Sequence, residues 1–235
     1  MTTPDAAPRT LVLWDIDHTL IETRGVGRAI YDRAFPAATG RPLAKLATIA
    51  GRTELDIMAE SLKVNGIEAT DQAVQKLADA LVQGYEEARE ELATTGRALP
   101  GAPEALAQFA ADPAIHQAIL TGNLRDVARI KLDVFDLASF LDFDSSAFGD
   151  DHADRSELVR IARQRAEART GARFDNMQVV LIGDTPNDVK AALSAGVRVI
   201  GVATGKTSEA GLRHAGATRT VSTLSELPAV IFSEF

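Results

Sequence analysis

The sequence contains no cysteine, and this absence excludes several kinds of chemistry at once. Without a thiol, the chain has no disulfide, no cysteine nucleophile and no cysteine-ligated metal. The histidines are scattered along the chain and form no cluster that would favour zinc. They are His18, His116, His152 and His214. A chain without cysteine fits a reducing compartment, and we expect a cytoplasmic protein.

Long apolar segments are also missing. No apolar run approaches the roughly 18 residues of a membrane-spanning helix. The stretch MTTPDAAPRT, residues 1–10, lacks the apolar centre of a signal peptide. We therefore expect neither a membrane partner nor a secretion signal.

Positive charge is scarce. The chain has 25 Lys and Arg against 33 Asp and Glu, which gives a formal net charge of −8. Because phosphate backbones bind to basic faces, we expect no nucleic-acid partner. A small phosphorylated ligand remains compatible, since its site needs only local positive charge. The 235 residues suit one large domain or two smaller ones, and leave monomer and homodimer open.

Short apolar runs predict buried strands, and helical patterns separate the later ones. The runs are residues 11–14, 118–120, 179–182 and 197–202. Residues 154–170 begin at a capping Asp154, and residues 185–196 have Thr185 as N-cap and Pro186 in the first turn. A further strand end is expected near SSAFG, residues 145–149. Alternating strands and helices predict an α/β fold with a doubly wound parallel sheet.

The segment between the first two predicted strands is purely helical in pattern. Residues 71–96 carry apolar side chains at helical spacing and predict one long helix. Glycine and proline mark both ends of the segment, as expected at linkers. We therefore divide the chain into a core domain, residues 1–22 and 100–235, and a helical cap domain, residues 23–99.

Acidic side chains follow the predicted strands. Asp15 and Asp17 come directly after the first run, and Asp184 and Asp188 follow the third. Ligands of a doubly wound sheet bind beyond the carboxyl ends of its strands, so these acids should converge. Crowded carboxylates repel one another, and a hard cation such as Mg²⁺ would relieve that repulsion.

This order of motifs resembles the haloacid dehalogenase (HAD) superfamily over nearly the whole chain. DIDHTL (15–20) matches the first motif, LTGN (120–123) the second, a basic residue the third, and GDTPND (183–188) the fourth. The resemblance implies a HAD-like, Rossmann-type core. The helical insert resembles the cap of the phosphoglycolate phosphatase-like and β-phosphoglucomutase-like branch.

The resemblance also implies roles for individual residues. Asp15 would form an aspartyl-phosphate, and Asp17 would protonate the leaving oxygen and then activate water. Mg²⁺ would be held by Asp15, Asp184 and the backbone carbonyl of Asp17, with Asp188 orienting the metal's water or the basic residue. Other residues would bind the phosphoryl group or the substrate: Thr121, Gly122, Asn123, Arg155 and Arg52.

Several of these residues have simpler explanations. Thr121 is also a candidate helix cap, and Thr185-x-x-Asp188 is also a capping box. Arg52, in the cap motif AGRTEL, is explained nearly as well by a plain helix start. For the third motif we favour Arg155, which begins a predicted helix. Its rivals are Lys131, Arg129 and Arg125.

The leading functional prediction is a Mg²⁺-dependent phosphatase acting on a small phosphorylated metabolite. A phosphomutase of the β-phosphoglucomutase type would share the same motifs. A haloacid dehalogenase needs no acid at Asp17 to protonate an alkoxide, so Asp17 disfavours it. A binding protein with a relic site is disfavoured because all four acids are present.

Overall fold

The computed structural model describes residues 8–49 and 51–234. Residues 1–7, at the start of the predicted core segment, and Phe235, at its end, lie outside the described residues. Ala50 of the AGRTEL motif lies outside them as well.

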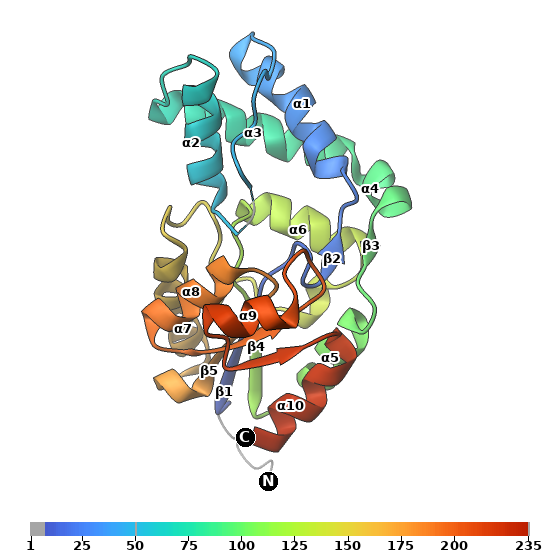
Figure 1. Ribbon diagram of the computed structural model, residues 1–235, viewed down its shortest axis with the longest axis vertical. Helices are drawn as coiled ribbons and strands as arrows, with labels where there is room; N and C mark the ends of the chain where they lie inside the picture. Colours follow the sequence, from blue (N-terminus) through green and yellow to red (C-terminus); the bar gives the residue numbers. More distant parts are fainter. Residues whose placement is uncertain (1–7, 50, 235) are drawn as a thin grey trace.

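A five-stranded parallel sheet in the order β4-β1-β5-β6-β7 forms the base of the molecule (Figure 1). Its strands are β1 (Thr10–Trp14), β4 (Ile115–Ile119), β5 (Val179–Gly183), β6 (Arg198–Val202) and β7 (Arg219–Val221). The predicted doubly wound α/β fold is confirmed. The central position of β1 places the first acidic motif in the middle of the sheet's carboxyl edge.

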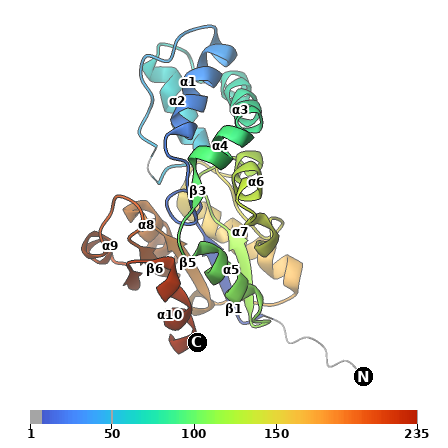
Figure 2. The ribbon, with the colours of Figure 1, turned by 90° about the vertical axis from the view of Figure 1, so that its right-hand side faces the viewer.

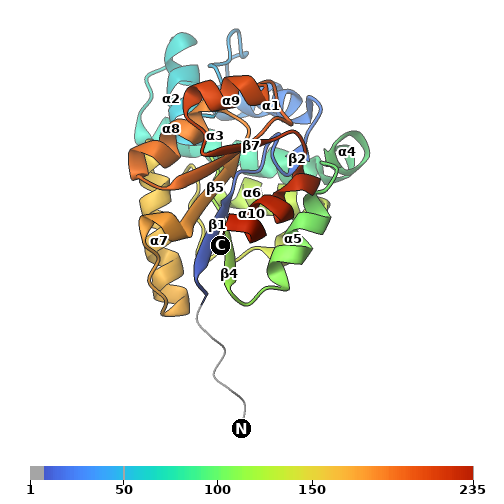
Figure 3. The same cartoon turned by 60° about the horizontal axis from the view of Figure 1, so that its bottom comes forward.

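Helices cover both faces of the sheet (Figure 3). Along β1, Val12 and Trp14 pack toward α5 (Ala102–Ala110) and α10 (Leu227–Glu234). The alternate residues Leu11 and Leu13 pack toward the other face, because successive strand side chains point to opposite sides. The helices of that face are α7 (Arg155–Thr170), α8 (Pro186–Ala195) and α9 (Glu209–Ala215). Both faces of β1 are therefore buried in apolar cores.

Four helices above the sheet make up the predicted cap (Figures 1 and 2). They are α1 (Val26–Thr39), α2 (Glu54–Val64), α3 (Asp71–Glu87) and α4 (Arg89–Thr95). Their apolar side chains share a separate core, which also includes Leu124, Val127 and Ile130 at α6 (Arg125–Val134). Helix α6 follows β4 and belongs to the proposed core domain. The cap helices therefore pack on the core through α6. The division into two domains stays our proposal.

Three local predictions were wrong. The single long helix over residues 71–96 is two helices, α3 and α4, because the backbone at Ala88 leaves helical geometry. The insert also contains a strand, β3 (Arg97–Ala98), which pairs antiparallel with β2 (Ile21–Glu22). The segment 145–149 adds no strand to the main sheet, and only Ala147 bridges to Leu120.

No helix in the described part of the chain has the length and apolar character needed to cross a membrane.

Candidate active site

The predicted site residues converge at the carboxyl edge of the sheet. Asp15 directly follows β1, Asp184 directly follows β5, and Thr121 lies just beyond β4. These strands are neighbours and parallel, so their carboxyl ends meet at one edge. The turn after β1 is tight, and His18 adopts a positive φ of 61° there. This left-handed conformation costs a residue with a Cβ atom more than it would cost glycine.

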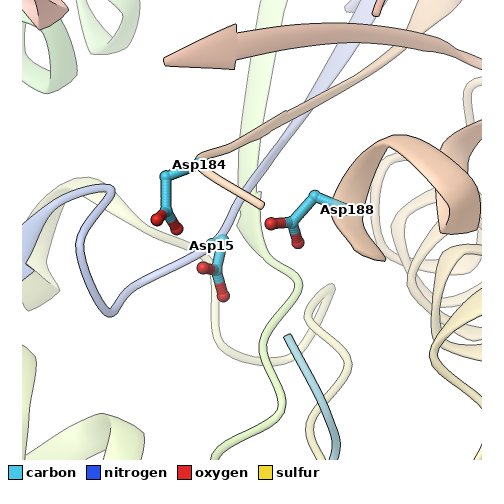
Figure 4. A group of neighbouring side chains, drawn as sticks. All are labelled: Asp15, Asp184 and Asp188. Carbon is cyan, nitrogen blue, oxygen red and sulfur yellow. The ribbon is translucent and has the colours of Figure 1, made fainter. Parts of the chain in front are cut away.

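Asp15, Asp184 and Asp188 form a compact buried cluster. One carboxylate oxygen from each lies within 4.8 Å of the others. Figure 4 shows the three carboxyl groups turned toward one another from the ends of β1 and β5 and from the first turn of α8. The structure thus brings together three of the four predicted acids through their side chains.

The cluster is electrostatically unfavourable on its own. Burial raises the pKa of Asp15 to about 7, with Asp188 and Asp17 adding to the rise and Arg155 opposing it. Burial, followed by Asp15 and Asp188, raises the pKa of Asp184 to about 8. A hard cation bound by these oxygens would stabilise the ionised forms. The donor set, carboxylates without sulfur or imidazole, fits Mg²⁺.

Arg155 is the basic residue that contacts this cluster. Its Nη2 donates to Asp15 Oδ1 at 2.8 Å and lies 2.6 Å from Asp188 Oδ1, and its side chain is 8% exposed. Its Nε is buried and meets no acceptor among the described residues. An orphaned buried guanidinium donor beside the predicted nucleophile suits a phosphoryl oxygen.

The rivals of Arg155 have other positions. Arg125 pairs with Asp144 at 2.9 Å, and Arg129 stacks over the ring of Phe143. Lys131 does reach the site, but it contacts Asp17 rather than the acid cluster. The structure therefore places two cations here, one beside each residue of the first acidic motif.

The two carboxylate oxygens of Asp188 have different partners. Its Oδ2 accepts hydrogen bonds from the Thr185 backbone N–H at 3.0 Å and from Thr185 Oγ1 at 2.6 Å, which completes the capping box of α8. Its Oδ1 faces Arg155. The capping role and the site role proposed for Asp188 are thus compatible, because different oxygens perform them.

The carboxylate of Asp17 pairs with side chains outside the three-acid cluster. Lys131 Nζ donates to Oδ1 at 2.8 Å and to Oδ2 at 2.7 Å. Asn123 Nδ2 donates to Oδ2 at 2.7 Å. Burial alone would raise the pKa of Asp17, but the Lys131 ammonium and the hydrogen bond from Asn123, with a smaller contribution from His18, together hold that pKa below its ordinary value. The backbone carbonyl of Asp17 as a metal ligand stays a prediction.

The loop after β4 contacts both the side chain of Asp17 and the backbone of the cap. Thr121 Oγ1 accepts from Asn123 Nδ2 at 2.8 Å, and Asn123 in turn contacts Asp17. Gly122 lies where a Cβ atom would come within 1.9 Å of the Arg52 carbonyl oxygen. The loop therefore needs glycine so that the cap backbone can pack directly on it.

The cap reaches the site through the start of α2. Glu54 N–H donates to the Gly122 carbonyl at 2.7 Å, and Thr53 Oγ1 donates to the Ala153 carbonyl at 2.9 Å. Arg52 places its carbonyl here, but its guanidinium turns to Asp56 and Glu60 on α2. The structure thus does not bring the Arg52 side chain to the acid cluster, and its role toward substrate remains a prediction.

Sequence patterns did not identify three polar side chains near Lys131. The hydroxyl of Tyr31 hydrogen-bonds to Glu54, and the ring of Tyr85 faces Lys131 at 5.1 Å. Burial raises the pKa of Glu54. A buried position of Tyr85 was predictable from helical spacing, but its neighbour on α6 was not. These contacts join elements far apart in the chain and leave no local signal.

Sequence comparison adds independent evidence. The model of the haloacid dehalogenase-like hydrolase family matches residues 12–193, a span that includes the acidic motifs and the entire helical insert. No curated protein matches the chain.

Solved structures share the fold over nearly the full length. A hydrolase from Pseudomonas syringae is 22% identical, with a TM-score of 0.69 and coverage of 96% of this chain and 98% of the other. A putative β-phosphoglucomutase from Thermotoga maritima is 23% identical, with a TM-score of 0.62 and coverage of 96% and 100%. A predicted phosphatase from Clostridium acetobutylicum is 18% identical, with a TM-score of 0.71 and coverage of 97% and 100%. At these identities the likeness concerns the fold.

Proposed function

Because the chain belongs to the haloacid dehalogenase-like hydrolase family, we propose that it is a Mg²⁺-dependent phosphatase. Its substrate would be a small phosphorylated metabolite, and its intermediate an aspartyl-phosphate on Asp15. One observation carries this proposal. Asp15 and Asp17 are two residues apart, yet each carboxylate faces its own buried cation, Arg155 or Lys131. Separate environments give two acids separate roles.

The first half-reaction uses both acids. A carboxylate oxygen of Asp15 attacks phosphorus, and the phosphorus–oxygen bond to the leaving group breaks. The leaving oxygen keeps the bonding electrons and takes a proton from the carboxyl group of Asp17. Arg155 stabilises the negative charge spread over the phosphoryl oxygens.

The second half-reaction returns the protein to its starting state. Water attacks phosphorus and gives a proton to Asp17, and the bond between phosphorus and Asp15 breaks. The products are inorganic phosphate and a free Asp15 carboxylate. A phosphomutase would instead return the phosphoryl group to a sugar, so release of inorganic phosphate separates the two functions.

The acid cluster is suited to hold the metal. Asp15 and Asp184 would supply carboxylates and Asp17 its carbonyl, while Asp188 holds Arg155 in place. Bound Mg²⁺ would neutralise the cluster and part of the charge on the phosphoryl group.

Hydrolysis of p-nitrophenyl phosphate tests the proposal. We expect turnover that requires Mg²⁺, releases inorganic phosphate and is abolished by Asp15→Asn, because an amide cannot act as the nucleophile. Asp126→Asn, the same change at an exposed position on α6, should leave turnover unchanged. Near-native activity of Asp15→Asn would refute the covalent mechanism.

A further inference from the structure

Lys131 is an almost fully buried cation that the acid cluster does not need. Only 4% of its side chain is exposed. Its Nζ donates to both carboxylate oxygens of Asp17 and to Asn123 Oδ1 at 2.7 Å. The ring of Tyr85, from the cap helix α3, faces the ammonium. With acceptors on one side and an aromatic ring on the other, the ammonium has one well-defined position.

The burial of the Lys131 ammonium carries a desolvation cost that its partners must offset. An apolar side chain of similar length would pack against Tyr85 and the cap core without any loss of hydration. The carboxylate of Asp17 does not need an ion-pair partner to replace lost hydration, because 36% of its side chain is exposed. The ammonium is therefore better explained by what it does to Asp17 than by its contribution to folding.

Lys131 and Asn123 distinguish the two oxygens of Asp17. Oδ2 accepts from both Lys131 and Asn123, which uses both of its lone pairs. Oδ1 accepts only from Lys131 among the contacts of the described residues, which leaves it one lone pair. Oδ1 is thus the oxygen that can still accept a hydrogen bond from water.

We propose that Lys131 is a positioning residue that fixes Asp17 so that Oδ1 takes the proton from the attacking water. This inference rests on the proposed function and refines its second half-reaction. The water oxygen forms a bond to phosphorus, the bond to Asp15 breaks with its electrons on the Asp15 carboxylate, and the proton moves to Asp17 Oδ1.

Rapid-mixing kinetics with p-nitrophenyl phosphate and Mg²⁺ test this role. Nitrophenolate leaves without needing a proton, so the first half-reaction should survive in Lys131→Met while the second slows. We expect a burst of nitrophenolate, with the steady-state kcat reduced about 10- to 100-fold. The ratio of burst rate to steady-state rate should rise at least about tenfold over the native protein.

The matched control is Lys76→Met, the same change at an exposed position of α3. It should behave as the native protein. Lys131→Arg, which keeps the charge, should recover part of the steady-state rate, whereas Lys131→Gln should not. If Lys131→Met does not fold, the comparison of Arg with Gln decides the question.

A failure of the inference about Lys131 can be distinguished from a failure of the proposed function. If Asp17→Asn shows a raised burst ratio but Lys131→Met does not, Lys131 has no positioning role and the proposed function stands. If neither the native protein nor Asp17→Asn forms a phosphoenzyme, the proposed function itself is wrong. An equal loss of both phases in Lys131→Met would also overturn the inference, since it would indicate general damage to the site.

Discussion

Asp15 and Asp184 carry most of the electrostatic cost of this site. Both are buried and both have raised pKa values, and within residues 8–49 and 51–234 the one cation that pairs with their cluster, Arg155, contacts Asp15 and Asp188 but not Asp184. A protein that needs ionised carboxylates here must stabilise them with something else. Mg²⁺ bound at this cluster is the partner that we propose, and its removal should be measurable as a loss of stability.

The free energy of unfolding of the metal-free protein should fall as the pH rises from about 4 to about 8. The pKa of an unfolded aspartate is 3.8, whereas Asp15 has a pKa of about 7 and Asp184 of about 8 in the folded protein. Between those limits the folded state binds more protons than the unfolded state, so a higher pH favours unfolding. Urea titrations in EDTA at several pH values measure the slope.

Two comparisons sharpen this test. Added Mg²⁺ should flatten the decline, because it binds the folded state and stabilises the ionised cluster. Asp184→Asn should also flatten it in EDTA, since it removes the carboxyl group with the higher pKa. A pH-independent free energy of unfolding in EDTA would contradict the proposed electrostatic cost.

At this scale the sequence was informative where a residue directly follows a strand. The predicted strand ends and a parallel sheet were enough to place three residues together: Asp15, Thr121 and Asp184. Lys131 was considered only as a rival of Arg155, because one sequence does not reveal which helix face meets the site. The interval of four between Val127 and Lys131 places both on one face of α6. The sequence alone did not show that this face meets Asp17.

The helix starts are the elements that hold the site in position. Helix α8 begins at Pro186, and the side chain of the preceding Thr185 both caps the helix and donates to Asp188. Helix α7 begins at Arg155, with Asp154 as its cap. Both caps were predicted from local sequence, because capping depends on residues only three positions apart. The break at Ala88 was not predicted, since neither a glycine nor a proline stands at that position.

Thr185→Ala should affect stability and activity together. Loss of the N-cap should cost about 1 kcal/mol of unfolding free energy. Turnover of p-nitrophenyl phosphate should fall by about tenfold, because Asp188 loses the hydroxyl that orients it toward Arg155. Urea titration and steady-state kinetics measure the two effects.

Thr70→Ala provides the matched control. Thr70 caps α3 in the same way, accepting from Ala73 N–H, but lies in the cap away from the acids. It should cost a similar free energy and leave turnover unchanged. If both variants lost activity equally, the hydroxyl of Thr185 would have no specific role at the site.

In the whole molecule, the helices of the proposed cap lie over the candidate site (Figures 1 and 2). Backbone atoms of the two parts touch directly, as Glu54 and Gly122 show, so a substrate cannot enter between them without some separation. We expect the cap to open for substrate and to close during chemistry, which limits access of bulk water. The order of the motifs predicted the fold and the helical insert. The individual contacts between cap and core were seen only in the structure.

Hydrogen exchange can detect this motion. The Glu54 amide, bonded to Gly122, should exchange more slowly when Mg²⁺ and orthovanadate, a phosphate mimic, are both present. Peptides from the middle of α3 should show no change in exchange rate, because the hydrogen bonds of their amides lie within one helix. Unchanged exchange at Glu54 would indicate that the cap does not respond to an occupied site.

The short ribbon of β2 and β3 has an evolutionary consequence. Glu22 and Arg97 are paired neighbours, so the chain leaves the sheet domain and returns to it at the same place. An insertion with adjacent ends can be lengthened, replaced or removed without rerouting the rest of the chain. A lineage could therefore exchange its cap while inheriting the acids at the edge of the sheet unaltered.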